Sequence, residues 1–368
     1  WLDDFAEFMA IKEHFGNQAL QKWDDKKAVA RDPSALDKYR SMLAEQIQYF
    51  KVTQYFFFKQ WSELKDYANQ RGIKIIGDMP IYVAADSVEV WTKPELFQLD
   101  EERNPLVVAG VPADQFSATG QLWGNPLYDW EEHKKQGYTW WIHRIEESFK
   151  IYDVLRIDHF KGFSDYWQVD GKAEVAKDGS WQPGPGYDLF KAVKEQLGDL
   201  PIIAEDLGNI DDKARKLLAD CNYPGMKILQ FGFEDVSGKS LDSPHYCIPH
   251  SIAYTGTHDN DVTNGWYNGL TAQQQQYIND YTHRREDESI CQAMIRQLFA
   301  TVSNTAIATM QDVLDLPASS RMNVPSTIGG NWQWRMQQSD LTQDKKDFLA
   351  KMTTLYQRAN QEKHNDEI

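Results

Sequence analysis

Two acidic residues follow largely apolar runs, where a carboxyl group meets surroundings unlike those of a surface acid. Asp158 follows residues 152–157, and Glu205 follows residues 200–204. The alternation of side chains along a strand places Arg156 on the same side as Asp158, and a neighbouring cation keeps a carboxylate ionised, as a nucleophile requires. Poor solvation after four apolar residues raises the pKa of Glu205 toward that of a general acid.

A third polar cluster follows the apolar residues 251–255. Thr257, His258 and Asp259 are consecutive polar side chains that cannot all serve a core, so at least one of them faces outward. An Asx turn that closes the strand is the structural alternative. His258 invites a metal site, but no second histidine lies at ligand spacing, and metal catalysis is therefore the weaker interpretation.

Together the three acids fit glycoside chemistry. Cleavage with retention needs two carboxyl groups of different pKa, about 5 to 5.5 Å apart, one acting as nucleophile and one as acid and then base. Adjacent parallel strands place their last residues about 4.8 Å apart, so Asp158 and Glu205 can meet this requirement. Asp259 can then stabilise the positive charge that develops at the anomeric carbon. The structural alternatives are an ion pair between Arg156 and Asp158 and a capping or loop role for Glu205.

The acids are positioned by short apolar runs that alternate with helical patterns, which indicates parallel strands joined by crossovers. The apolar positions are consecutive, as in strands covered on both faces. Because an acid follows nearly every run, and all strand ends of a barrel face one rim, we predict an α/β fold of the (β/α)8 TIM-barrel class rather than a doubly wound sheet. The expected strands are residues 73–76, 152–157, 200–204, 226–233, 251–255 and 305–310, and the expected helices include residues 140–149, 188–197 and 213–219.

The remaining segments suggest one catalytic domain over residues 1–368 with two additions. Residues 1–70 carry a helical pattern and read as a mainly helical insertion. Residues 108–130 are rich in Gly, Pro and aromatic residues and show no helical or strand period, so we expect an active-site loop there. Phe116, Trp123 and Tyr128 could cover the site from this loop, or simply pack over the barrel mouth.

Composition narrows the range of partners. The chain has 55 acidic against 39 basic residues and a formal net charge of −16, which disfavours nucleic acid as a partner. Its 13 Trp side chains suit stacking on neutral sugars. No apolar run approaches the roughly 18 residues of a membrane span, so we expect no membrane association. Cys221, Cys247 and Cys291 show no metal-ligand spacing and favour reduced thiols in the cytoplasm.

Three motifs in this order resemble those of bacterial amylomaltases, the 4-α-glucanotransferases related to the α-amylase clan. They are Arg156-Ile157-Asp158-His159-Phe160, Ala204-Glu205-Asp206-Leu207-Gly208 and Thr257-His258-Asp259-Asn260-Asp261. The resemblance extends over nearly the whole chain through further segments: 77–81, 111–117, 120–126, 226–231, 321–325 and 330–332.

The resemblance implies a role for each matching residue. Asp158 is expected to be the nucleophile, Glu205 the acid/base and Asp259 the stabiliser of the transition state. Substrates would be α-1,4-glucans and malto-oligosaccharides, and no metal or cofactor would be needed. The expected sugar-binding residues are Arg156, His258, Asp235, Asp114, Gln121, Trp123 and Asn331, with Asp78 placed near the site.

Two other functions remain open at this point, an amylase-type hydrolase with the same carboxylates and a noncatalytic glycan-binding role. The chain opens at Trp1 in what reads as the middle of a helix. The resemblance implies that the first barrel strands precede this point, so we expect a barrel that is N-terminally incomplete. The sequence makes no prediction of the oligomeric state.

Overall fold

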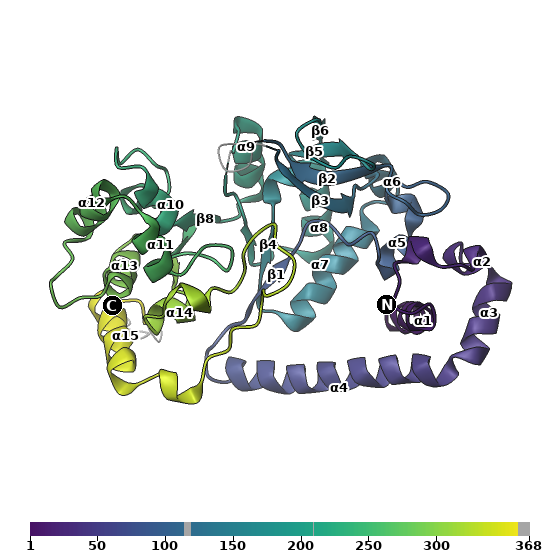
Figure 1. Cartoon of the computed structure of the whole chain (residues 1–368), viewed down its shortest axis with the longest axis horizontal. Helices are drawn as coiled ribbons and strands as arrows, with labels where there is room; N and C mark the ends of the chain where they lie inside the picture. Colours follow the sequence, from purple (N-terminus) through teal and green to yellow (C-terminus); the bar gives the residue numbers. More distant parts are fainter. Residues whose placement is uncertain (114–118, 209, 360–368) are drawn as a thin grey trace, which may run out of the picture. The chain divides into compact units, whose positions relative to one another are not determined.

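The computed structural model describes residues 1–113, 119–208 and 210–359 (Figure 1). The chain divides into two compact units, Trp1–Tyr223 and Pro224–Ile368, and each is described by itself. Within the described residues, no helix combines the length and the apolar character that crossing a membrane requires.

The first unit begins with four helices. They are α1 (Leu2–His14), α2 (Lys26–Val29), α3 (Pro33–Met42) and α4 (Ala44–Asn69). Capping explains where the middle two begin, because Asp25 accepts bonds from the first backbone N–H groups of α2 and Asp32 does the same for α3. Helix α4 is 26 residues long and runs as one continuous helix (Figure 1). It exposes several aromatic side chains, among them Tyr49 and Phe56.

A parallel sheet forms the centre of the first unit. Its strands are β1 (Ile76–Met79), β4 (Val154–Ile157) and β7 (Ile202–Ala204), in the order β1-β4-β7. Helices α7 (Thr139–Ile151), α8 (Tyr187–Leu197) and α9 (Asp212–Cys221) alternate with these strands along the chain. Leu155, Ile157, Ile202 and Ala204 are buried in the core, which agrees with strands covered on both faces.

The expected strand at residues 73–76 was placed too early. Strand β1 begins at Ile76, and Ile73 is exposed. Pairing with β4 runs instead from Ile76 to Met79 and brings Asp78 opposite Arg156. The charge of this cross-strand pair favours the observed register, whereas the apolar pattern alone favours the earlier one.

A second sheet of the first unit corrects the expectation that residues 108–130 lack strands. Strands β2 (Val107–Val111), β3 (Gln121–Pro126), β5 (Asp165–Asp170) and β6 (Ser180–Pro183) form an antiparallel sheet in the order β3-β2-β5-β6. Gly110 permits the close approach of β2 and β3, because a Cβ there would lie 2.5 Å from the carbonyl oxygen of Gln121. The segment therefore contains two strands, β2 and β3, with Asp114 and Phe116 outside the described residues.

The second unit also contains a parallel sheet, with strands β8 (Gly225–Ile228), β9 (Ser251–Tyr254) and β10 (Thr305–Ile307) in the order β10-β9-β8. The expected single strand over residues 226–233 is wrong, because the run continues as helix α10 (Leu229–Glu234). The run at residues 305–310 likewise ends as a strand at Ile307. The other helices of this unit are α11 (Thr263–Gly269), α12 (Ala272–Thr282), α13 (Ile290–Phe299), α14 (Met310–Val313) and α15 (Gln343–Leu355).

The prediction of a mixed α/β fold with parallel strands and crossover helices is confirmed. The described parallel strands lie in two sheets, one in each unit, and the strand pairing does not by itself display a closed barrel. The remaining short elements are α5 (Val88–Thr92), α6 (Trp130–Lys135) and the 3-10 turns η1 (Leu20–Lys22), η2 (Pro94–Leu96), η3 (Phe160–Phe163), η4 (Pro244–Tyr246), η5 (Ala318–Ser320) and η6 (Gln338–Asp340).

Candidate active site

A buried guanidinium organises the carboxyl ends of β1 and β4. Arg156 Nη1 donates to Asp78 Oδ1 at 2.6 Å and to Asp158 Oδ1 at 2.9 Å. The side chain of Arg156 is 10% exposed, whereas those of Asp78 and Asp158 are 41% and 43% exposed. Burial opposes the charge of Arg156, but the two neighbouring carboxylates outweigh it and raise the pKa of the guanidinium. Asp158 therefore has a permanent cation beside it.

Asp158 and Glu205 leave the sheet side by side. Ile157 and Ala204, the residues before them, are register partners in β4 and β7. The backbone N–H of Glu205 donates to Ile157 O at 3.0 Å, and the N–H of Phe160 donates to Glu205 O at 3.0 Å. The two acidic residues are therefore about one strand spacing, 4.8 Å, apart in their backbones, which suits the carboxyl separation of a retaining enzyme.

The carboxyl group of Glu205 lies among groups that pull its pKa in opposite directions. It accepts backbone bonds from His159 N at 2.7 Å and Leu207 N at 2.8 Å, which favour the ionised form. Burial and the nearby charge of Asp158 favour the neutral form, and they outweigh Arg156 and the two N–H groups, so the pKa of Glu205 rises to about 7. A carboxyl group with this pKa can both donate and accept a proton near neutral pH.

His159 contacts both the carboxylate of Glu205 and the aromatic ring of Trp123. Its backbone is left-handed, with φ of 49°, which is uncommon outside glycine and orients the turn that follows Asp158. The His159 ring packs edge-to-face against Trp123, with centroids 4.8 Å apart, and burial lowers the pKa of His159 to about 4. The indole N–H of Trp123 donates to Gln121 Oε1 at 3.3 Å. Sequence reasoning did not select His159, although its position next to Asp158 was a usable signal.

The second unit holds Asp259 in a different way. Asn323 Nδ2 donates to Asp259 Oδ1 at 2.6 Å, and Arg321 Nη2 donates to the backbone carbonyl oxygen of Asp259 at 2.7 Å. His258 Nε2 lies 3.4 Å from Asp259 Oδ2, and its ring lies 5.0 Å from that of Trp332. Arg321, Asn323 and Trp332 were not among the predicted site residues, although they fall in segments 321–325 and 330–332 that carried the resemblance.

Two further predicted residues are bound within their own turns. Asp235 accepts bonds from the backbone N–H of Ser237 at 2.9 Å and from its hydroxyl at 2.7 Å, and the hydroxyl bond lowers the pKa of Asp235. Asn331 accepts a bond from Val324 N at 3.0 Å and donates to the hydroxyl of Thr327 at 3.0 Å. Both side chains thus have a structural role in their loops, and a role toward sugar stays a prediction. Asp114 lies outside the described residues.

The structure therefore brings together one set of predicted residues around the ends of β4 and β7 and another set after β9. The first set is Asp78, Gln121, Trp123, Arg156, Asp158 and Glu205, and the second is His258 and Asp259. In the described part of the chain, one group of three side chains has the geometry of cation ligands, His143, Glu146 and Glu147. It lies on helix α7, which carries none of the predicted site residues.

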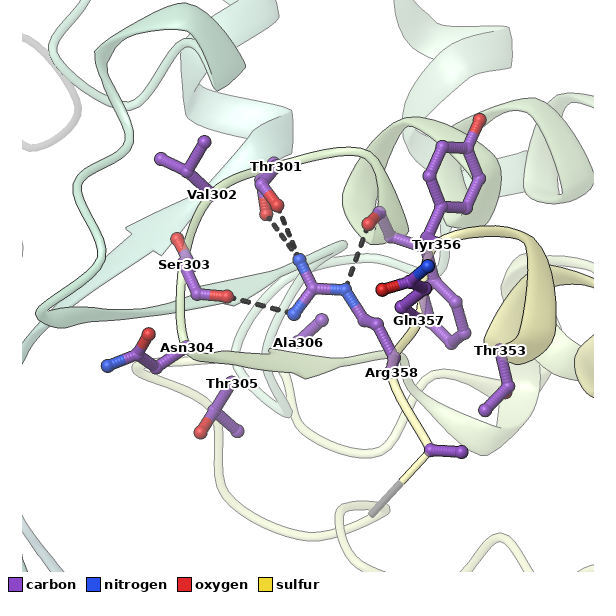
Figure 2. A pocket seen from close by; sticks show the side chains of 12 residues that line it. Thr301, Val302, Ser303, Asn304, Thr305, Ala306, Thr353, Tyr356, Gln357 and Arg358 are labelled. Carbon is purple, nitrogen blue, oxygen red and sulfur yellow. Dashed lines mark hydrogen bonds between the residues drawn. The ribbon is translucent and has the colours of Figure 1, made fainter. Parts of the chain in front are cut away.

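A hollow in the second unit does not coincide with the acids. Figure 2 shows Arg358 at its centre, where the guanidinium donates to the carbonyl oxygens of Thr301 at 2.5 Å and Ser303 at 2.8 Å. The lining includes Asn304 and Thr305, at the amino end of β10. Asp259 follows the carboxyl end of β9, which runs parallel to β10, so this hollow lies at the opposite end of the sheet from Asp259. The bonds of Arg358 to backbone carbonyl oxygens indicate that it stabilises the fold there.

Comparison with known proteins gives one consistent result. A family profile described as 4-alpha-glucanotransferase matches residues 1–342. The 4-alpha-glucanotransferase of Streptococcus pneumoniae serotype 4 is 53% identical over 362 residues, covering 98% of this chain and 72% of the relative. The chloroplastic/amyloplastic 4-alpha-glucanotransferase of Solanum tuberosum is 40% identical over 344 residues, covering 92% of this chain and 58% of the relative. The structure of amylomaltase from Streptococcus agalactiae in complex with acarbose matches with a TM-score of 0.96 and 60% identity. The match covers 97% of this chain and 72% of that structure's chain.

Proposed function

The chain belongs to the 4-alpha-glucanotransferase family and has that activity, and we propose that it works by a retaining double displacement with Asp158 as nucleophile and Glu205 as acid/base. The substrates are α-1,4-glucans and malto-oligosaccharides, and one glucan segment moves from a donor chain to an acceptor chain. The observation that carries the proposal is the pair of carboxyl groups on neighbouring strand ends, one beside a buried arginine and the other with a raised pKa.

In the first half of the reaction, Glu205 protonates the glycosidic oxygen while Asp158 attacks the anomeric carbon. The bond to the leaving sugar breaks as a β-linked glycosyl ester forms on Asp158. In the second half, the ionised Glu205 removes a proton from the hydroxyl of an incoming sugar, which attacks the ester and releases Asp158. Two inversions give net retention, and Glu205 returns to its protonated form.

Arg156 supports this role of Asp158 by keeping a positive charge beside the attacking carboxylate. Its bond to Asp158 occupies one lone pair of Oδ1 and leaves the other oxygen free of Arg156 for attack. Asp78 shares the same guanidinium nitrogen, which offsets part of the charge so that Asp158 is not held too strongly.

The other predicted residues are assigned to sugar binding. Asp259 stabilises the oxocarbenium-like transition state, and His258 contacts the ring hydroxyls beside it. Trp123 is 37% exposed, and its aromatic ring suits stacking on glucose. The remaining assignments, supported by the family resemblance, are Arg156, Asp235, Asp114, Gln121, Asn331 and Asp78.

We also propose that the parallel strands of both sheets belong to one (β/α)8 barrel and that residues 1–368 form one catalytic domain. The high similarity to an amylomaltase structure supports this architecture. In it, residues 1–70 are a helical insertion and residues 108–130 cover the site. The free thiols Cys221, Cys247 and Cys291 support a reducing, cytoplasmic location.

Incubation of the full-length protein with maltotriose tests the activity. Transfer produces longer and shorter oligomers together with glucose, with no net gain of reducing ends, because each bond broken is replaced by one formed. A hydrolase would instead increase the number of reducing ends in proportion to the bonds broken. Binding of maltotriose without any change in its length would indicate a glycan-binding protein.

A further inference from the structure

We propose that Lys161 is a positioning residue that fixes the turn after Asp158 against the segment after Glu205. The inference rests on the proposed roles of those two acids. Lys161 is the third residue after Asp158, in the turn η3, and its side chain is only 11% exposed. A buried ammonium is costly unless it is paired, so its partners indicate what it holds in place.

Lys161 joins three elements through its ammonium group. Nζ pairs with Asp165, the first residue of β5, and donates to Asp211 Oδ2 at 3.0 Å. The other oxygen of Asp211 accepts a bond from Ala214 N at 2.9 Å and so caps helix α9. One carboxylate therefore connects Lys161 to the start of the helix that follows Glu205 in the chain.

The indole of Trp181 is a third partner of the Lys161 ammonium group and adds a fourth element, β6, to the cluster. Lys161 Nζ lies 4.4 Å from the centroid of the Trp181 ring, over its face. Trp181 belongs to β6, whose partner strand β5 carries Asp165. The electron-rich face of an indole attracts a cation, so Trp181 helps to hold the ammonium group of Lys161 in place.

The Lys161 cluster is connected to Glu205 through the backbone at the start of η3. The residue before Lys161, Phe160, donates its N–H to Glu205 O at 3.0 Å. The residue before that, His159, donates its N–H to the Glu205 carboxylate at 2.7 Å. Lys161 has no direct bond to either catalytic carboxyl group among the described contacts, so it acts by holding these two N–H groups in place.

This arrangement predicts how the proton transfer changes when Lys161 is removed. The bond from His159 N favours the ionised form of Glu205, so loosening it raises the pKa of Glu205. The other groups acting on Glu205 are Asp158, Arg156 and the N–H of Leu207, and none of them is altered by the change. The alkaline limb of kcat/KM therefore moves to higher pH, while kcat falls because the acid is less well placed.

The test compares Lys161→Met, Lys161→Arg and Lys191→Met in the full-length protein, with maltotriose disproportionation measured from acidic to alkaline pH. Lys161→Met keeps the apolar stem and should lower kcat about tenfold, with KM changed less than kcat, and move the alkaline limb upward. Lys161→Arg keeps the positive charge and should retain most of the wild-type kcat and the wild-type position of the alkaline limb. Lys191→Met, on an exposed part of α8, should match the wild type.

Asp211→Asn separates positioning from simple electrostatics. Asparagine still caps a helix, so α9 should persist, and circular dichroism and a melting curve check this for each variant. Removal of a negative charge alone would lower the pKa of Glu205, whereas loosening of the Lys161 cluster raises it. An upward shift of the limb in Asp211→Asn supports the proposal, and a downward shift or none overturns it.

An unchanged kcat and pH profile in a folded Lys161→Met protein would also overturn the proposal. That result would leave the assignment of Asp158 and Glu205 intact, because those roles are tested by their own substitutions. Conversely, full activity of Asp158→Asn would remove the proposed function whatever Lys161 does.

Discussion

In both units, acidic residues follow apolar segments of the sequence, but the groups that surround their carboxylates differ. Asp158 and Glu205 in the first unit pair with a buried arginine and with backbone N–H groups. Asp259 and Asp235 in the second unit are held by an asparagine amide and by the residues of a local turn. All four follow apolar segments, so position alone does not determine which acid is reactive.

The difference is one of burial and charge. Glu205 lies where burial and a neighbouring carboxylate raise its pKa to about 7, whereas the hydroxyl of Ser237 lowers the pKa of Asp235. A raised pKa lets an acid exchange a proton near neutral pH, and a lowered one fixes the acid as an anion. Glu205 therefore has the pKa that the proposed proton transfer needs, whereas Asp235 has that of an acid that stays ionised and closes its turn.

The largest expected effect comes from Asp158→Asn. The amide cannot form the glycosyl ester, so kcat should fall by about 10,000-fold or more, with the fold retained. The matched control is Asp287→Asn, which changes an exposed acid of the second unit with no assigned role and should change kcat less than about threefold. Maltotriose disproportionation measures both, and equal losses in the two variants would erase the contrast between the units.

Glu205→Gln should lose about 100-fold to 10,000-fold in kcat, because it removes proton donation to the leaving sugar. In the wild type, the free enzyme must carry a proton on Glu205, so kcat/KM should fall about tenfold per pH unit above about pH 7. The variant should lack this alkaline limb. A limb that persists in Glu205→Gln would assign the titration to a different group.

Arg156→Met tests the buried cation. Without it, Asp78 and Asp158 face each other with no counter-charge, so kcat should fall about 100-fold through misplacement of the nucleophile. Stability should fall by about 1.5 to 3 kcal/mol from the lost charged hydrogen bonds. Urea unfolding and steady-state kinetics measure these losses. Arg156→Lys should recover part of the stability and less of the rate, since one ammonium cannot reproduce the planar fork.

Of the four site substitutions considered, Asn323→Ala should have the smallest effect on activity. Loss of its bond to Asp259 frees the carboxylate without changing its charge, so KM for maltotriose should rise a few-fold, consistent with about 1 kcal/mol for one hydrogen bond. A loss as large as that of Asp158→Asn would place Asn323 in the chemical step itself.

The contact between Arg156 and Asp158 could be predicted from the sequence because strand alternation is a local property. Arg156 and Asp158 lie two residues apart, so their contact follows from the pleat once residues 154–157 are a strand. The bond between Arg156 and Asp78 depends on a register between strands far apart in the chain, which no local pattern determines. This is why β1 was placed three residues too early.

Short apolar runs were the other source of error. Residues 226–233 read as one strand, but the structure changes to a helix at Leu229, and apolar runs of this length do not distinguish the two. The strands within residues 107–126 were hidden by Gly and Pro, although Gly110 is the residue that lets two backbones approach. His159 was missed because its contribution to Glu205 is a backbone N–H, which every residue type offers.

The most direct test is to trap the glycosyl ester. In Glu205→Gln, α-glucosyl fluoride can still react, because fluoride leaves without protonation, while the second step lacks its base and the ester accumulates. Mass spectrometry of the digested protein should find glucose on the peptide that carries Asp158, and none when Asp158→Asn is added. Glucose attached to another residue, or turnover of the fluoride with no ester on Asp158, would contradict the account.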